Sequence, residues 1–201
     1  TQVKDEVNRM LDMVSKNIGD AFDTLIKYDE KSRQKVEERE EYIDYLNKGI
    51  SEYIVSLMSG EMNADDSRKI NGYYAIISNL ERIGDHATNI AEYADDMKKW
   101  DLQFSDNVLD ELEEMKKQCI ASLENVKNVE PADTGRILSQ AEVLEQKTDD
   151  MRDKYFKKQM QRLKKGKCKP QSGIVFSEVL TDFERMGDHA LNIAQQYKEM
   201  G

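Results

Sequence analysis

Apolar residues recur at three- and four-residue steps along most of the chain. In residues 1–28 they share one side of a predicted helix: Val3, Val7, Met10, Leu11, Val14, Ile18, Ala21, Phe22 and Leu25. This spacing matches the turn of an amphipathic α-helix. Two further segments of the same kind span about 32–59, which ends before Gly60, and about 63–99. The first hundred residues are therefore predicted to form three helices.

The second half of the chain has the same order of helical patterns. They span about 104–129, 134–165 and 171–200, and Pro131 and Gly166 lie between them. A proline disfavours helical geometry in the residue before it, so Pro131 separates the first two. Only 2 prolines and 10 glycines occur in the chain, which excludes a turn-rich all-β design. We predict an all-α six-helix bundle made of two tandem three-helix repeats, residues 1–100 and 101–201.

A repeated motif supports this division of the chain. Residues 81–91, ERIGDHATNIA, return 103 positions later as ERMGDHALNIA at residues 184–194. A looser acidic pattern returns 105 positions later on the middle helices: Glu40 and Asp44, then Glu145 and Asp149. Such internal similarity is typical of structural repeats. The two halves are therefore expected to pack as a pseudo-symmetric pair.

The charge balance narrows the function classes. The chain has 40 acidic and 30 basic residues, for a formal net charge of −10. A nucleic-acid-binding protein usually has a basic excess, so a general nucleic-acid role is excluded. No apolar run approaches the roughly 18 residues that span a bilayer. The chain opens on Thr1 rather than methionine, which suggests a fragment of a longer protein or a trimmed one. Cys119 and Cys168 are expected to be free thiols.

Four Glu-x-x-x-Asp pairs carry the candidate chemistry. They are Glu40 with Asp44, Glu81 with Asp85, Glu145 with Asp149, and Glu184 with Asp188. Residues four apart lie nearly on one side of a helix, where like charges repel. Burial raises that cost unless protons or cations compensate. Two helices that each bring a pair would gather four carboxylates, a donor set suited to magnesium, manganese, calcium or iron.

Neighbouring residues leave alternatives open. Solvent, or Arg82 and Arg185 together with nearby lysines, would also satisfy the carboxylates. Gly84 and Gly187 each cost about 1 kcal/mol inside a helix, which suggests the close approach of another helix or a ligand. His86 and His189 stand about 100° around the helix from the preceding aspartate, so we predict structural histidines rather than ligands. Asn89 and Asn192 lie partly off the acidic stripe and are expected to hydrogen-bond across helices.

No ordinary catalytic set is visible in the sequence. There is no Glu-x-x-His pair of a di-iron bundle, no phosphate-binding glycine loop and no zincin motif. We therefore predict that the protein is not an enzyme. A metal-free helical adaptor and a metal-dependent phosphohydrolase are the alternatives. The basic stretch 164–170 indicates either a helix end with dipole-compensating lysines or contact with anionic lipid.

Residues 80–87 and 89–92 closely resemble the signature of the PhoU family of phosphate-uptake regulators. The resemblance implies two three-helix repeats with multinuclear clusters of iron or zinc. Glu81, Asp85, Glu184 and Asp188 are then the best-supported ligands, and the middle-helix pairs match more loosely. Gln195 stands where the first repeat has Glu92, so the two clusters would differ if that position contributes a ligand.

The family includes free regulators that restrain a phosphate transporter and its sensor kinase, and cytoplasmic tails of sodium/phosphate cotransporters. Residues 4–11 resemble the start of the tail form. The resemblance thus implies a cytoplasmic regulatory domain that acts by contact with a transporter or sensor kinase, and it favours the cotransporter tail. Membrane contact is then expected only through the transporter, and a homodimer stays open.

Overall fold

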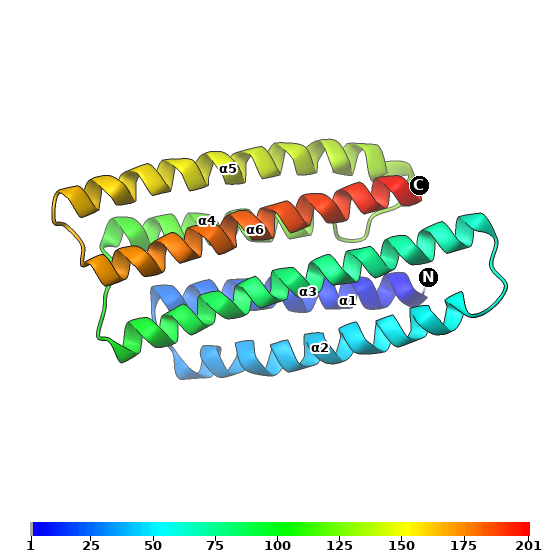
Figure 1. Ribbon diagram of the computed structural model, residues 1–201, viewed down its shortest axis with the longest axis horizontal. Coiled ribbons are helices and arrows are strands. Elements are labelled where there is room, and N and C mark those ends of the chain that lie inside the picture. The colour runs from blue at the N-terminus through cyan, green and yellow to red at the C-terminus, as the bar shows by residue number, and fades with distance from the viewer. Residues whose placement is uncertain (1) are drawn as a thin grey trace.

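The computed structural model describes residues 2–201, which form six α-helices, one short 3-10 helix and no strand (Figure 1). The elements are α1 (Gln2–Ile26), α2 (Glu30–Met58), α3 (Ala64–Lys99), α4 (Asp106–Glu124), η1 (Pro131–Asp133), α5 (Thr134–Lys164) and α6 (Pro170–Met200). This confirms the predicted all-α class. Residue 1, where the first predicted helix begins, lies outside the described residues.

The helices form two three-helix units joined side by side. Helices α1, α2 and α3 make the first unit, and α4, α5 and α6 make the second. Extensive contacts between α3 and α6 join the units, and α1 also packs on α4. The bundle is elongated, and both chain ends lie at its right-hand end in Figure 1. The signature helices α3 and α6 therefore occupy the centre of the molecule.

One continuous apolar core runs through both units. Helix α1 buries a complete apolar stripe, and Met10, Val14 and Phe22 on it are fully inaccessible. Phe176 and Phe183 of α6 are likewise fully buried. The amphipathic spacing of the sequence thus translates directly into burial, the main favourable contribution to folding. In the described part of the chain, no helix combines the length and apolar character that crossing a bilayer requires.

The fourth helix is shorter than the predicted span 104–129. Helix α4 ends at Glu124, and Asn128 adopts a left-handed backbone conformation with φ of 52°. Its N–H donates a hydrogen bond to the side chain of Asn8 at 3.0 Å. Val126 and Val129 remain buried in the following loop, so their apolar character extended the helical pattern beyond its real end.

Candidate metal centres and the polar interface between the repeats

In the first repeat, the acidic pair of α2 faces the acidic pair of α3. Burial raises the pKa of Glu40, and the negative charges of Asp44, Asp85 and Glu92 add to the rise against an opposing hydrogen bond from Thr88. The pKa of Asp44 is raised by burial and then by the charge of Asp85. These effects show that the predicted carboxylates of α2 and α3 lie near one another, and we call Glu40, Asp44, Glu81 and Asp85 the first carboxylate cluster. Within the described residues, no three of them bring carboxylate oxygens within 4.8 Å of one another.

On α3, the pKa of Glu81 is raised for the same reasons. Its pKa is raised by burial, then by the charge and hydrogen bond of Asp85, and then by Asp44, while Arg82 opposes these effects more weakly. Glu40, Asp44 and Glu81 therefore each lie in a surrounding that disfavours their negative charge.

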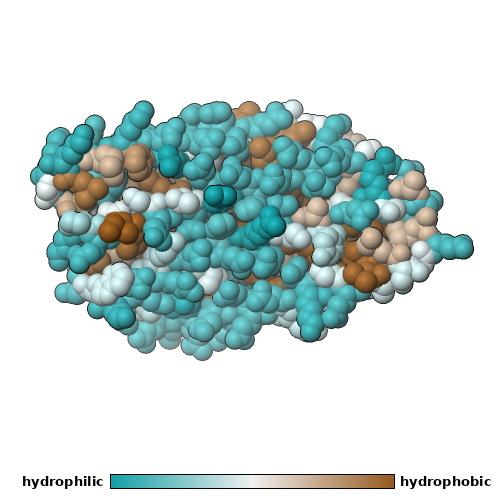
Figure 2. All heavy atoms as spheres, viewed as in Figure 1, coloured by the Kyte–Doolittle hydropathy of each residue, from teal (hydrophilic) through white to brown (hydrophobic). Residues whose placement is uncertain are grey.

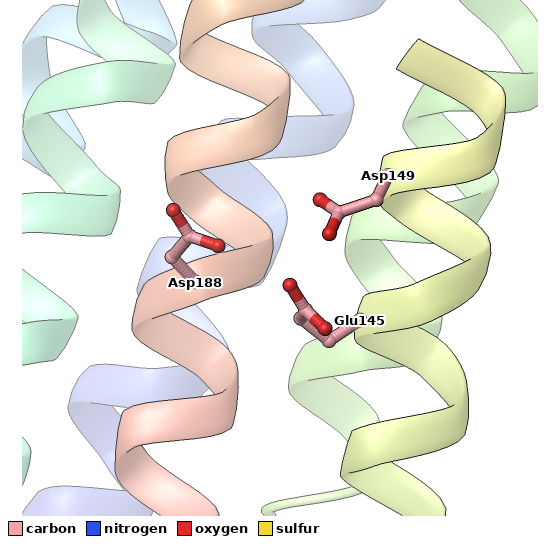
Figure 3. Close-up of side chains that lie close together, drawn as sticks. All are labelled: Glu145, Asp149 and Asp188. Carbon is pink, nitrogen blue, oxygen red and sulfur yellow. The ribbon is translucent and has the colours of Figure 1, made fainter. Parts of the chain in front are cut away.

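In the second repeat, α5 and α6 bring together Glu145, Asp149 and Asp188 (Figure 3). One carboxylate oxygen from each lies within 4.8 Å of the other two. Burial, together with the hydrogen bond and charge of Asp149, raises the pKa of Glu145 to about 7. The pKa of Asp188 is raised by burial and then by Glu184 and Asp149. With Glu184, these residues form the second carboxylate cluster.

Glu184 differs from its three neighbours because it has a cationic partner. Arg152 of α5 lies 3.3 Å from a Glu184 carboxylate oxygen, and its guanidinium stands 5.2 Å from the centre of the Phe156 ring. The corresponding position of the first repeat is Asn47. Arg152 is not among the residues that the sequence singles out, although it lies one helical turn from Asp149. Of the described ion pairs, this is the one that reaches either cluster.

The donor set of both clusters fits a metal ion chemically. Every candidate ligand is a carboxylate oxygen on one of two adjacent helices, and several have a pKa that is raised by burial and then by the negative charges crowded around them. A proton or a cation relieves that crowding, and hard cations prefer such oxygens. The residues therefore fit the ions expected from the sequence.

The two glycines within the repeated motif have different surroundings. A Cβ at Gly187 would lie 2.9 Å from Cγ2 of Thr148 on α5, so the expected close helix approach is confirmed there. A Cβ at Gly84 would lie 3.8 Å from Ile43 and 3.9 Å from Val14, which is ordinary van der Waals contact. The expectation of an unusually close neighbour is therefore wrong at Gly84. Ile43 and Thr148 occupy equivalent positions, and only the second pair packs tightly.

The histidines lie in the α3–α6 interface, where Asp182 is a buried acceptor. Asp182 is 5% exposed. It accepts hydrogen bonds from His86 Nδ1 at 2.6 Å, Asn89 Nδ2 at 3.1 Å and Tyr93 Oη at 2.7 Å. All three donors come from the opposite repeat. This confirms the prediction that Asn89 bonds across helices, and it gives His86 a structural role in the interface.

The equivalent hydrogen bonds around His189, on the other side of this interface, are longer and involve a neutral acceptor. Asn79, the equivalent of Asp182, accepts from His189 Nδ1 at 3.1 Å and from Asn192 Nδ2 at 3.4 Å. The two imidazole rings stack with centroids 5.7 Å apart. Burial, with the nearby His86, lowers the pKa of His189 to about 4, so this ring is neutral at physiological pH.

Asp182 is a buried structural acceptor that the sequence did not predict. The available signal is a heptad spacing: Asp182 precedes His189 by seven residues, as Asn79 precedes His86. Residues seven apart share a helix side, so each acceptor lies on the same side as the histidine of its own helix.

The comparisons agree with this architecture. A model of the PhoU domain matches the chain twice, at residues 7–94 and 106–197. The matches cover most of the chain, and we conclude that the chain belongs to the PhoU domain family. The family expectation from the sequence is thereby confirmed, and so is the fold of two tandem repeats.

The similarity to named proteins extends over nearly the whole chain. The chain is 26% identical over 204 residues to the Thermotoga maritima phosphate-specific transport system accessory protein PhoU homolog 1, covering 100% of this chain and 87% of that protein. It is 27% identical over 199 residues to a PhoU homolog of Clostridium acetobutylicum that carries the same description, covering 96% and 88%.

Two solved structures share the fold. PhoU from Pseudomonas aeruginosa superposes with a TM-score of 0.86 at 21% identity, covering 99% of this chain and 95% of that chain. The phosphate transport system regulatory protein PhoU from Streptococcus pneumoniae gives 0.83 at 17% identity, with coverage of 99% and 93%.

Proposed function

We propose that this protein regulates phosphate transport through contact with a phosphate transporter or its sensor kinase. Membership of the PhoU domain family carries the proposal, together with relatives matched over their length that are named as accessory proteins of phosphate-specific transport systems. The extensively packed central pair α3 and α6 suits a protein that presents a surface to a partner, rather than one that encloses a substrate.

We also infer that the two carboxylate clusters bind metal ions. Glu40, Asp44, Glu81 and Asp85 would hold ions in the first repeat, and Glu145, Asp149, Glu184 and Asp188 in the second. The crowding of Glu145, Asp149 and Asp188 within 4.8 Å supports this most directly. Iron is the proposed occupant because it suits carboxylate oxygens and also belongs to the pair, iron or zinc, that the family resemblance implies. Bound ions would join α2 to α3 and α5 to α6.

Deletion of the protein from its host tests the regulatory role. We expect phosphate uptake to continue when external phosphate is abundant, because the restraint on the transporter is lost. Wild-type protein should restore the restraint, while a variant with Asp85→Asn and Asp188→Asn should restore less of it. Uptake that is indifferent to the deletion contradicts the proposal.

The rival functions give different results with purified protein. Hydrolysis of a phosphate ester that disappears in Asp85→Asn protein would indicate a metal-dependent phosphohydrolase. Thermal stability that is unchanged after chelation would indicate a metal-free adaptor.

Location, assembly and attachment stay predictions with simple tests. We place the domain on the cytoplasmic side of the membrane, where it would contact a transporter. An antibody against this chain should detect a band much larger than 23.3 kDa in host cells if the domain is the tail of a sodium/phosphate cotransporter. A band near that mass indicates a free regulator. Light scattering of the purified chain distinguishes a homodimer from a monomer.

A further inference from the structure

Residues 154–177 form a basic segment in an otherwise acidic protein. The segment contains eight basic residues and no aspartate or glutamate: Lys154, Lys157, Lys158, Arg162, Lys164, Lys165, Lys167 and Lys169. The whole chain has a net charge of −10, so the acidic excess lies entirely outside this segment. Charge separation of this kind marks an interaction surface for an anion.

The lysines of this segment are available to an external partner. All seven are exposed, and none takes part in an ion pair among the described residues. Arg162 is different, because its guanidinium binds both carboxylate oxygens of buried Glu111 at 3.1 and 3.0 Å. Arg162 therefore anchors α5 to α4, while the lysines around it point to solvent.

The segment occupies one end of the bundle. It comprises the C-terminal part of α5, the turn at Gly166 and the start of α6, at the left of Figure 1. Gly166 adopts φ of +65°, and Lys167 N–H donates to the Arg162 carbonyl at 2.9 Å, which closes α5. Lys169 precedes α6 without a side-chain cap, so the positive end of that helix dipole adds to the lysine charge.

Apolar side chains lie beside the lysines. Met160, Leu163 and Ile174 line an open groove between α5 and α6. Ile174 is 63% exposed and Phe156 is 37% exposed. Figure 2 shows brown, apolar atoms among the teal ones at this end of the molecule. Lysines next to exposed apolar groups are typical of surfaces that lie on a membrane.

Acidic residues of α4 restrict the surface to its outward side. Asp110 and Glu114 line a cleft of about 630 Å³ together with Lys154, Lys158, Lys165 and Lys167, which compensates those lysines locally. The uncompensated charge is therefore greatest at the outward lysines Lys157, Lys164 and Lys169.

We propose that this basic end docks on a membrane surface that contains anionic phospholipid. The lysines bind headgroup phosphates, and Ile174 enters the interface beside them. The acidic remainder of the molecule is repelled by the same surface, which orients the bundle with this end toward the lipid. The proposal goes beyond contact with a transporter, because the chain itself recognises the bilayer.

Vesicle co-sedimentation of the purified chain tests this proposal. We expect binding to vesicles that contain phosphatidylglycerol, little binding to pure phosphatidylcholine, and a loss of binding as salt is added. A variant with Lys157, Lys164 and Lys169 changed to Gln should bind about a hundredfold more weakly, given the contribution of each lysine near an anionic surface.

A matched control removes the same charge elsewhere. Lys48, Lys69 and Lys198 are also exposed and outside the described ion pairs, and they lie in the second half of α2, at the start of α3 and at the end of α6, away from the basic end. Changing these three to Gln should weaken binding less than about threefold, because their charges are screened from the docked surface. Ile174→Ser should weaken it about fivefold through the loss of apolar contact.

Three outcomes would overturn the proposal. They are equal binding to neutral and anionic vesicles, equal losses in the two triple variants, and no vesicle binding by wild-type protein. Displacement of bound protein by millimolar inorganic phosphate at constant ionic strength would also overturn it, because the site would then recognise free phosphate. Circular dichroism confirms that each variant is folded.

Discussion

The two repeats share a backbone plan but hold their outer helices in different ways. Helix α2 is attached by a row of buried aliphatic side chains: Val36, Ile43, Leu46, Ile50 and Ile54. Helix α5 buries few apolar groups and depends on polar contacts instead. Gln118 of α4 donates to the Leu144 carbonyl at 2.9 Å, and Arg162 pairs with buried Glu111. One architecture is therefore stabilised by two kinds of packing.

The carboxylate clusters repeat this contrast. Helix α2 has Asn47 where α5 has Arg152, whose guanidinium already pairs with Glu184. The second repeat thus carries a cation paired with one of its carboxylates, while the first has only the weaker influence of Arg82 on Glu81. The comparison shows that the motif places candidate ligands on the same helices in both repeats, while the neighbouring residues decide how close together and how free those carboxylates are.

The largest expected difference between the repeats is at the α3–α6 interface. Asp182→Ala leaves three donors without their acceptor, and we expect a loss of about 3–5 kcal/mol in the free energy of unfolding. Asn79→Ala removes weaker hydrogen bonds and should cost about 1–2 kcal/mol. Urea unfolding of both variants measures the difference. Equal losses would show that Asp182 is not the main polar anchor.

Alanine substitutions at the two motif glycines should change the stability of the protein in opposite directions. Gly187→Ala places a methyl group against buried Thr148, which is held by a hydrogen bond from its hydroxyl to the Leu144 carbonyl, and should cost about 1–3 kcal/mol. Gly84→Ala meets no such obstacle, so the better helix propensity of alanine should stabilise the protein by up to about 1 kcal/mol. Thermal unfolding provides the comparison. A destabilising Gly84→Ala would indicate a constraint at that position beyond its observed neighbours.

Substitutions that give each repeat the residue of the other at positions 152 and 47 should alter the affinity of its cluster for metal. Arg152→Asn frees Glu184, and we expect metal to bind the second cluster about tenfold more tightly, because a competing cation is removed. Asn47→Arg should weaken binding at the first cluster by a similar factor. Calorimetric titration of chelator-treated protein with ferrous ion or manganese measures both. Unchanged affinities would show that Glu184 is not a ligand.

The smallest expected effect is on the pH dependence of folding stability in metal-free protein. The pKa of Glu145 is about 7 in the folded protein, well above the usual value for glutamate. The folded state therefore holds this proton over a range in which the unfolded chain has released it. Its contribution to stability is fully present at acidic pH and is lost as the pH rises through 7. Glu145→Gln should flatten this decline in chelated protein, as followed by thermal melts from pH 5 to 8.

The sequence was sufficient for the architecture because burial follows the helical repeat so closely. Apolar periodicity of the kind seen in α1 predicts the helices, and the return of the signature motif divides them into two repeats. The end of α4 was missed because Val126 and Val129 stay buried in a loop, where apolar periodicity does not distinguish a loop from a helix.

The candidate site was only partly predictable for a physical reason. Spacing along one helix places Glu81 beside Asp85, but it does not identify which residue of another helix faces them. Arg152 and Asp182 act across helices, so their roles depend on the packing of α5 on α6 and of α3 on α6.

The metal content of gently purified protein tests the central inference most directly. Wild-type protein should be compared by elemental analysis with an Asp85→Asn/Asp188→Asn variant, and with Asp150→Asn as a control for an exposed aspartate of α5 outside both clusters. We predict near-stoichiometric iron, or another transition metal, in wild-type and control protein and a marked loss in the double variant. Equal metal content in all three proteins, or none in any of them, would contradict the assignment of the carboxylate clusters as metal centres.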